Sequence, residues 1–389
     1  MWHAPSFMTP RPHPHTPTSS TPRYFFRQRT IRVIVRAPIC SEVLSVNYSH
    51  TMNSSATALS LSLSLIAASA LCFYARRRLR RRRIITDEQW HQFDRDGYCI
   101  LAPEQVFASP ADDLAMLQQR IDDIMLDACA ERPPYEQMMM QLDSSTGDYA
   151  DAGEQTLGFK GKTLRYRKIQ NLDLDALVMA YLRLPCFREA CSRVYGEATP
   201  IASFRTMFFN KPSSHSSGQA GGTRLPWHQD RWRFLDIDPL LNAYLALDPA
   251  TPESGCVRIL PGSHKLGVLN PEHHSAFLTE EQIERHCGAE AEATPGAILD
   301  LRLAPGEVAL IHNWVIHSSG VNRTARPRRA LSVSYMDART YMSEAEFGQF
   351  TGGELKSSGY PEGGTSFPLV FGGRAVDKPD DRDHLIGSD

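Results

Sequence analysis

The chain has 389 residues, 42% of them apolar, which is enough for one large domain with a tail or for two small domains. Its formal net charge is −2, but the charge is unevenly distributed along the chain. Residues 1–85 hold 13 arginines, no lysine and one acid, which gives +12, and the other 304 residues together carry −14. An acidic body argues against nucleic acid as substrate or partner, which would need a basic surface, and gives no special support to an anionic acyl-CoA.

The N-terminal region predicts targeting or membrane attachment. Residues 1–55 are rich in Pro, Ser, Thr, His and Arg without periodicity, which is typical of a disordered or targeting segment. Residues 56–75 contain no charged side chain and are long enough to span a bilayer, so they predict a single transmembrane anchor. The basic linker 76–84 carries seven arginines, and the positive-inside rule therefore predicts a membrane-anchored protein with the following domain in the cytosol.

The same region has a second interpretation. Serines interrupt the apolar stretch at positions 60, 62, 64 and 69, and the Arg-rich, acid-poor composition is equally typical of a cleaved organelle transit peptide. Translation from Met1 and from Met52 both remain open. The eight cysteines form no Cys-x-x-Cys pair, which fits reduced thiols in a reducing compartment.

A single folded domain is expected over residues 85–374, followed by a tail at 375–389. It opens with a capping box, Thr86-Asp87-Glu88-Gln89, and the glycine at position 97 predicts the end of that helix. Further helices are predicted at 111–131, 174–184 and 186–195, after a strand at 98–101. Strands dominate from 201 to 337, so the order of helices followed by strands indicates an α+β fold.

The motif that points to chemistry lies in the run Pro-Trp-His-Gln-Asp-Arg-Trp at 226–232. His228 and Asp230 are two residues apart, so on a strand both side chains lie on one face. With a later histidine they would make the two-histidine, one-carboxylate triad that holds non-haem Fe(II) and leaves positions open for substrate and oxygen. Two later candidates, His312 and His317, are five residues apart and face opposite sides of a strand, so only one of them can join.

The order of these segments resembles the phytanoyl-CoA dioxygenase family from about residue 85 to about residue 374. The resemblance includes Asn-Lys-Pro at 210–212, the metal segment, the Pro-Gly-Ser-His corner at 261–264, and a histidine followed by Ser-Ser-Gly and, eleven residues on, an arginine. It implies a double-stranded β-helix, a cupin-like jelly roll with flanking helices, preceded by the candidate transmembrane helix.

The resemblance also implies roles for individual residues. His228, Asp230 and His317 would be the iron ligands, and His312 a packed strand histidine. Arg328 would pair with the distal carboxylate of 2-oxoglutarate, with Ser319 donating to the same group. Tyr244 and Gln229 are weaker candidates for contacts with this co-substrate. The implied reaction uses O2 and Fe(II) to convert 2-oxoglutarate into succinate and CO2 while the main substrate is oxidised.

The first hypothesis is therefore a membrane-tethered Fe(II)- and 2-oxoglutarate-dependent hydroxylase of a small or lipid-like molecule. The carboxylate of Asp230 disfavours halogenation, since related halogenases have a small residue there, while desaturation remains open. The alternatives are phytanoyl-CoA 2-hydroxylase activity itself and a non-catalytic metal-binding member of the fold. The residues 213–223 before the metal strand are equally typical of a substrate-gating loop and of an ordinary insertion.

Overall fold

The computed structural model describes residues 31–33, 44–46, 83–126, 137–213, 221–273, 276–343 and 367–372. The chain divides into two units, residues 1–80 and 81–389. In the first unit β1 (Ile31–Val33) pairs antiparallel with β2 (Leu44–Val46). The predicted anchor at 56–75, most of the segment 1–55 and the tail at 375–389 lie outside the described residues. Within the described part of the chain, no helix is long and apolar enough to cross a membrane.

The second unit is built on two antiparallel β-sheets. The small sheet has the order β11-β10-β13-β8 and the large one β3-β12-β9-β14-β7-β6-β4-β5, with β15 also paired to β7. The small sheet consists of β8 (Leu225–His228), β10 (Val257–Ile259), β11 (Leu299–Asp300) and β13 (His317–Ser319). The large sheet consists of β3 (Tyr98–Leu101), β4 (Met139–Leu142), β5 (Thr156–Leu157), β6 (Tyr166–Gln170), β7 (Ile201–Lys211), β9 (Leu241–Ala246), β12 (Val308–His312), β14 (Arg328–Asp337) and β15 (Leu369–Phe371).

From β7 onward the chain alternates between the two sheets. β7, β9, β12 and β14 belong to the large sheet, while β8, then β10 and β11, and then β13 belong to the small one. This alternation makes two four-stranded layers wound around each other, which is the double-stranded β-helix that the resemblance implied. The α+β order predicted from the sequence is confirmed as well.

Strand periodicity separates an outer apolar face of the large sheet from an inner face that lines the cavity. In β9, Leu241, Ala243 and Leu245 belong to the core beneath the helices, whereas Asn242 and Tyr244 line the cavity. This is the two-residue alternation of a strand with a core on one side and a site on the other. The polar residues of the site are therefore presented by the same strands that build the hydrophobic core.

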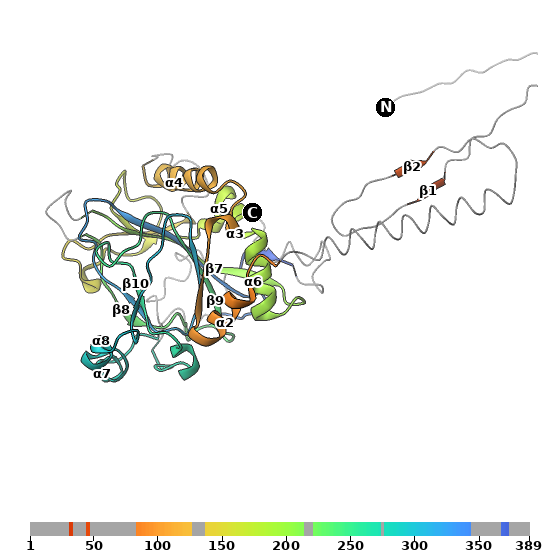
Figure 1. Cartoon of the computed structure of the whole chain (residues 1–389). Helices are drawn as coiled ribbons and strands as arrows, with labels where there is room; N and C mark the ends of the chain where they lie inside the picture. Colours follow the sequence, from red (N-terminus) through yellow and green to blue (C-terminus); the bar gives the residue numbers. More distant parts are fainter. Residues whose placement is uncertain are drawn as a thin grey trace, which may run out of the picture. The chain divides into compact units, whose positions relative to one another are not determined.

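The helices before β7 cover the outer face of the large sheet, as Figure 1 shows. They are α2 (Asp87–Asp96), α3 (Pro103–Val106), α4 (Pro110–Leu126), α5 (Ala176–Leu182) and α6 (Pro185–Tyr195). The predicted capping box of Thr86 and Gln89 is present, and Gly97 ends α2 in the left-handed conformation at φ 80°. The helix predicted at 111–131 is described only as far as Leu126. Two further helices, α7 (Glu280–Cys287) and α8 (Ala289–Ala293), follow β10.

The strands β4, β5 and β6 widen the large sheet beyond β7, and the sequence did not predict them. Two to five residues long, they include the polar run Tyr-Arg-Lys-Ile-Gln of β6, all five residues of which are buried. A charged run of this kind normally predicts an exposed segment. Its burial means that the extra strands bring cationic side chains into the interior of the barrel.

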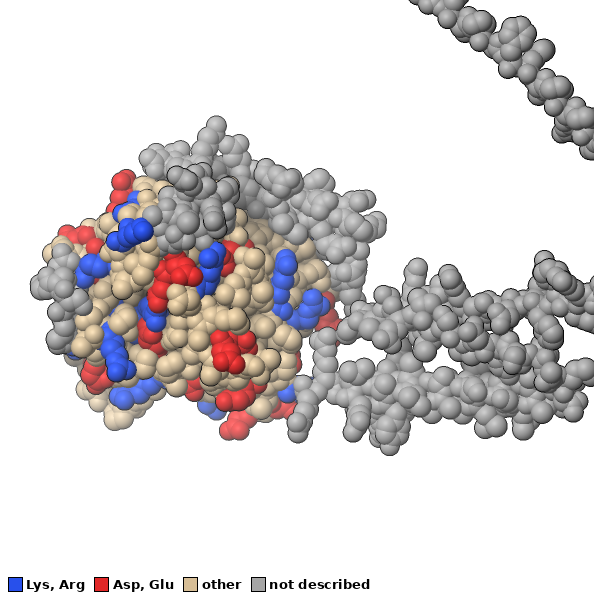
Figure 2. Space-filling view, turned by 90° about the horizontal axis from the view of Figure 1, so that it is seen from above, with Lys and Arg blue, Asp and Glu red and all other residues tan. Residues whose placement is uncertain are grey.

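The surface carries charges of both signs. On the face shown in Figure 2, acidic and basic side chains are interspersed and form no stripe of a single sign. The five described cysteines, Cys99, Cys186, Cys191, Cys256 and Cys287, are all free and buried, as the expectation of reduced thiols requires.

Candidate metal centre

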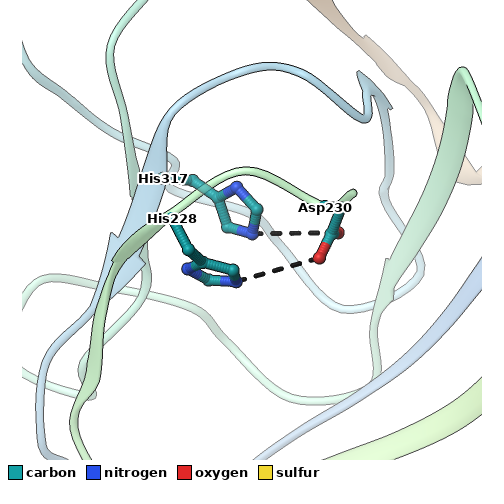
Figure 3. Close-up of side chains that lie close together, drawn as sticks. All are labelled: His228, Asp230 and His317. Carbon is teal, nitrogen blue, oxygen red and sulfur yellow. Dashed lines mark ion pairs between the residues drawn. The ribbon is translucent and has the colours of Figure 1, made fainter. Parts of the chain in front are cut away.

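The structure brings His228, Asp230 and His317 together, as Figure 3 shows. His228 ends β8 and lies directly opposite His317, which begins β13, while Asp230 follows in the next loop. The Nε2 atoms of His228 and His317 each lie 3.8 Å from a carboxylate oxygen of Asp230. One potential ligand atom from each residue lies within 4.8 Å of the other two, and no other group of this kind occurs among the described residues.

Backbone carbonyls orient both imidazoles. Nδ1 of His228 lies 2.9 Å from the carbonyl oxygen of Pro226, and Nδ1 of His317 lies 3.0 Å from that of Val315. Each Nδ1 therefore carries the proton and donates it to a carbonyl, which leaves Nε2 as the free lone pair. Two Nε2 atoms and one carboxylate oxygen, each about 2 Å from a common centre, would lie no more than about 4 Å apart. The donor set fits one divalent ion.

Asp230 is held by Asn242 of β9 and by Asn313, which directly follows β12. Its backbone N–H donates to the carbonyl of Asn313 at 2.7 Å, and the amide of Asn242 donates to Oδ2 at 3.4 Å. Asn242 is in turn fixed by Ser332, whose hydroxyl donates to the amide oxygen at 2.9 Å. The carboxylate is thus oriented from the large sheet while the two imidazoles come from the small one.

Burial shifts the pKa values of two members of the triad, in the direction that favours metal binding for His228 and in the opposite direction for Asp230. Burial, and then the neighbouring His317, lowers the pKa of His228 well below its ordinary value. Burial raises the pKa of Asp230, while His317 opposes that shift. A neutral imidazole is the form that binds a metal, and a cation in the cavity would compensate the buried carboxylate.

The predicted co-substrate arginine lies in the same cavity. Arg328 is only 3% exposed, contacts the hydroxyl of Tyr244 through Nη1 and donates from Nη2 to the carbonyl of Gly255 at 2.9 Å. Its Nε is buried without a partner among the described residues. Ser319 and Tyr244 also line the cavity. A buried guanidinium with an unused donor is suited to a carboxylate that enters the site.

Gln229 does not lie in the cavity. Its side chain is fully buried, donates to the carbonyls of Gly267 and Trp314 at 2.8 and 2.7 Å, and accepts from the backbone N–H of Leu269 at 2.8 Å. It follows the end of β8 directly, and its side chain is not part of the cavity lining that His228 and Asp230 share. Gln229 instead ties its own segment to the backbone at 267–269 and at Trp314.

His312 lies outside the triad, as predicted. Its ring is 5.1 Å from that of His264 and 6.3 Å from that of Phe93, between ring centroids. Nδ1 accepts a hydrogen bond from the backbone N–H of Trp314 at 3.1 Å. Burial, and then His264, lowers the pKa of His312 to about 4. It is a neutral packing residue at the end of β12.

The sequence left two cavity residues without a role, Arg167 and Lys211. Arg167 comes from the unpredicted strand β6, and no motif marked it. Lys211 belongs to the Asn-Lys-Pro segment, which carried the family resemblance but no role of its own. The structure places Lys211 inside the cavity.

Comparison with known proteins agrees with this geometry. The family model described as phytanoyl-CoA dioxygenase (PhyH) matches residues 93–330. The chain is 26% identical over 255 residues to a probable phytanoyl-CoA dioxygenase of Caenorhabditis elegans, covering 65% of this chain and 75% of that protein. It is 28% identical over 181 residues to the peroxisomal phytanoyl-CoA dioxygenase of Bos taurus, covering 46% of this chain and 52% of that protein.

A solved structure is also similar. EctD from S. alaskensis, crystallised with 2-oxoglutarate and 5-hydroxyectoine, is 19% identical with a TM-score of 0.46, covering 68% of this chain and 80% of that one. The chain spans about half the length of the bovine relative that it matches.

Proposed function

The chain belongs to the phytanoyl-CoA dioxygenase family, and from this premise we propose that it is an Fe(II)- and 2-oxoglutarate-dependent oxygenase that hydroxylates a small organic or lipid-like substrate. The observation that supports this most strongly is the convergence of His228, Asp230 and His317 in one buried cavity that also contains Arg328. Three protein ligands of this kind leave positions open for a co-substrate and oxygen.

Each residue of the site then has a task. The two Nε2 atoms and the carboxylate of Asp230 would hold Fe(II), which, with 2-oxoglutarate and O2, supplies the oxidising chemistry. Arg328 would bind the distal carboxylate of 2-oxoglutarate through its guanidinium, and the hydroxyl of Ser319 would donate to the same group. Their positions in β14 and β13 fix the co-substrate relative to the metal ligands.

The apolar part of the lining excludes water from the reacting atoms. Met207 and Phe209 line the cavity from β7, Val257 lines it from β10 and Ile311 from β12. Excluding water from the reacting atoms limits the side reactions of an oxidation. An apolar surface beside the metal would therefore favour oxidation of a substrate C–H bond. The same side chains would contact the carbon skeleton of a substrate.

The proposal is tested by metal binding and by co-substrate turnover. Wild-type protein is expected to bind one Fe(II) and to form succinate from 2-oxoglutarate in an Fe(II)-dependent way when supplied with a metabolite extract. His228→Ala and Asp230→Ala should lose both, while His312→Gln, a histidine outside the triad, should keep both. Metal binding without any decarboxylation would favour the non-catalytic alternative.

Phytanoyl-CoA 2-hydroxylase activity is the alternative proposal, and the names of the relatives support it. Succinate release should be compared with phytanoyl-CoA, free phytanic acid and an unrelated acyl-CoA at equal concentration. Turnover that requires phytanoyl-CoA would favour this alternative. Turnover with other organic substrates only would favour the broader proposal.

We also propose that residues 56–75 tether the domain to a membrane with the catalytic part in the cytosol. The uncharged stretch followed by seven arginines supports this. The full chain should stay with membranes after alkaline extraction, whereas a chain lacking residues 56–75 should not. A full chain released by that extraction, and shortened at its N-terminus inside an organelle, would favour the transit-peptide alternative.

A further inference from the structure

Two cationic side chains in the cavity have no role in the reaction described above. Arg167 and Lys211 line the cavity that contains the metal ligands, and each is only 6% exposed. Neither forms an ion pair with a carboxylate in the part of the chain that the structure describes. A buried cation without a counter-charge is costly, so its presence calls for an anion that arrives from outside.

Arg167 has donors to spare. Its guanidinium lies over the ring of Tyr149, 5.0 Å from the centroid, and Nη1 donates to the side-chain oxygen of Gln141 at 2.7 Å. That is the one hydrogen bond of this guanidinium to a described residue. Because an arginine has five N–H donors in a fixed planar arrangement, the rest can bind an oxyanion.

Aromatic rings connect Arg167 to the metal ligands. The Tyr149 ring that it covers lies 5.5 Å from the ring of Phe277, edge to face, and Phe277 lies 5.2 Å from the ring of His228 in the same manner. These ring contacts link the guanidinium to the first metal ligand. Since Arg167 and the metal ligands line the same cavity, a molecule bound there would present its anionic end to Arg167 and another part to the metal.

Lys211 contributes from the neighbouring strand. It lies opposite Arg328 in the pairing of β7 with β14, and its Nζ donates to the carbonyl of Thr223 at 2.5 Å. Burial lowers the pKa of Lys211, and the guanidinium groups of Arg328 and Arg167 lower it further. An anion placed beside both groups would favour the charged lysine.

The carboxylate of Asp143, which interacts electrostatically with Arg167 and Lys211, already has other partners. Asp143 lies 3.2 Å from Nη2 of Arg165 and accepts from the hydroxyl of Thr223 at 2.7 Å. One carboxylate therefore interacts with Arg165, Arg167 and Lys211, which leaves an excess of positive charge. The co-substrate does not account for this excess, because its distal carboxylate is assigned to Arg328 and its other carboxylate would face the metal ion.

We propose that Arg167 and Lys211 form an anion-binding subsite for the main substrate, which therefore carries a carboxylate or phosphate group in addition to the apolar part that is oxidised. This inference rests on the proposed function, which gives the reaction. The charge of the substrate is inferred from the cavity residues alone. The substrate is then an amphiphilic organic anion.

The test compares three probes with eight-carbon chains and different head groups, two of them anionic and one neutral. Binding of octanoate, octyl phosphate and the neutral octanamide to the full chain is measured by calorimetry in the presence of Mn(II) and saturating 2-oxoglutarate, which fills the co-substrate position. Octanoate or octyl phosphate should bind at least about tenfold more tightly than octanamide, since a charge-assisted hydrogen bond contributes about that factor or more. The tighter of the two anions identifies the group that the subsite prefers.

Variants locate the effect. Arg167→Gln and Lys211→Met should each lose most of the preference for the anion, whereas Arg302→Gln, which removes an exposed arginine outside the cavity, should retain it. Equal binding of octanoate, octyl phosphate and octanamide, or no binding of any of them, would overturn the inference, as would full retention of the preference in Arg167→Gln. Anion binding that disappears when 2-oxoglutarate is added would also overturn it, because the probe would then occupy the co-substrate position.

The comparison of charged and neutral probes uses wild-type protein, so it stands even where a variant does not fold. It also separates this inference from the proposed function. Protein that binds neither Mn(II) nor 2-oxoglutarate would contradict the oxygenase, while a preference for an anion that Arg167→Gln abolishes would still support the subsite.

Discussion

Arg328 and Arg329 are consecutive in β14 and point to opposite faces of the large sheet. Arg328 enters the cavity, whereas Arg329 points to the helix-covered side, where its Nε lies 2.8 Å from Asp248 and its Nη1 lies 2.5 Å from Asp122. One arginine is therefore available to a ligand and the other is committed to two carboxylates of the protein. The choice of Arg328 as the ligand-binding arginine follows from this geometry as well as from its distance to His317 along the chain.

Substituting Arg329 should affect stability rather than ligand binding. Arg329→Gln leaves the half-buried carboxylates of Asp248 and Asp122 without their partner, so we expect the free energy of unfolding to fall by about 2–4 kcal/mol. Denaturant unfolding measures it, with Arg302→Gln, an exposed arginine, as the control within about 0.5 kcal/mol of wild type. Loss of 2-oxoglutarate binding in folded Arg329→Gln would contradict the division of roles between the two arginines.

Asn242 should tune metal affinity without being a ligand. Its amide donates to Oδ2 of Asp230 at 3.4 Å, so Asn242→Ala frees the carboxylate to rotate away from the imidazoles. Residues that orient a metal ligand typically change affinity about 10–100-fold, and we expect the Kd for Co(II) to rise by about tenfold. Ser334→Ala, which removes a hydroxyl that contacts the same amide at 3.3 Å, is the milder comparison. A Kd within twofold of wild type would show that Asp230 needs no such support.

Gln229 should behave as a scaffold residue. Gln229→Ala would leave two carbonyls and one N–H without their partner in a buried region, and we expect a loss of about 2–4 kcal/mol in the free energy of unfolding. The KM for 2-oxoglutarate of the folded variant should stay unchanged, because the side chain does not reach the cavity. A raised KM with unchanged stability would restore the co-substrate role that the sequence suggested.

His312 should make the domain less stable in mild acid. Its pKa is about 4 in the folded protein against 6.5 for an ordinary histidine, so the unfolded chain takes up a proton first as the pH falls. The stability that the neutral ring contributes is complete above about pH 6.5 and is lost progressively down to about pH 4. Between pH 7 and pH 5 this loss amounts to about 2 kcal/mol.

The comparison of wild type with His312→Gln isolates this histidine from His264, whose pKa burial also lowers. Unfolding free energies are measured for both proteins at pH 7 and pH 5. The variant should lose less stability than wild type over this interval. Equal losses in the two proteins would assign the acid sensitivity to other groups.

Much of the site could be predicted from the sequence because its residues lie close together along strands. The spacing of His228 and Asp230 predicted that both side chains meet at one site, and they do, although β8 ends at His228 and both Gln229 and Asp230 lie just beyond it. The capping box of α2 is similarly local. Arg167 was not predictable, because its position depends on β6 pairing with β7, which no neighbouring residue encodes.

The direct pairing of His228 with His317 also bears on how the barrel folds. A slip of one residue between β8 and β13 would turn one imidazole out of the cavity, because each residue along a strand faces the side opposite to its predecessor. Only the correct alignment of these two short strands therefore yields an ion-binding protein. Ion uptake during refolding would therefore report the correct alignment of the small sheet. Chains trapped in a shifted alignment would not bind the ion, so they could be separated from native chains.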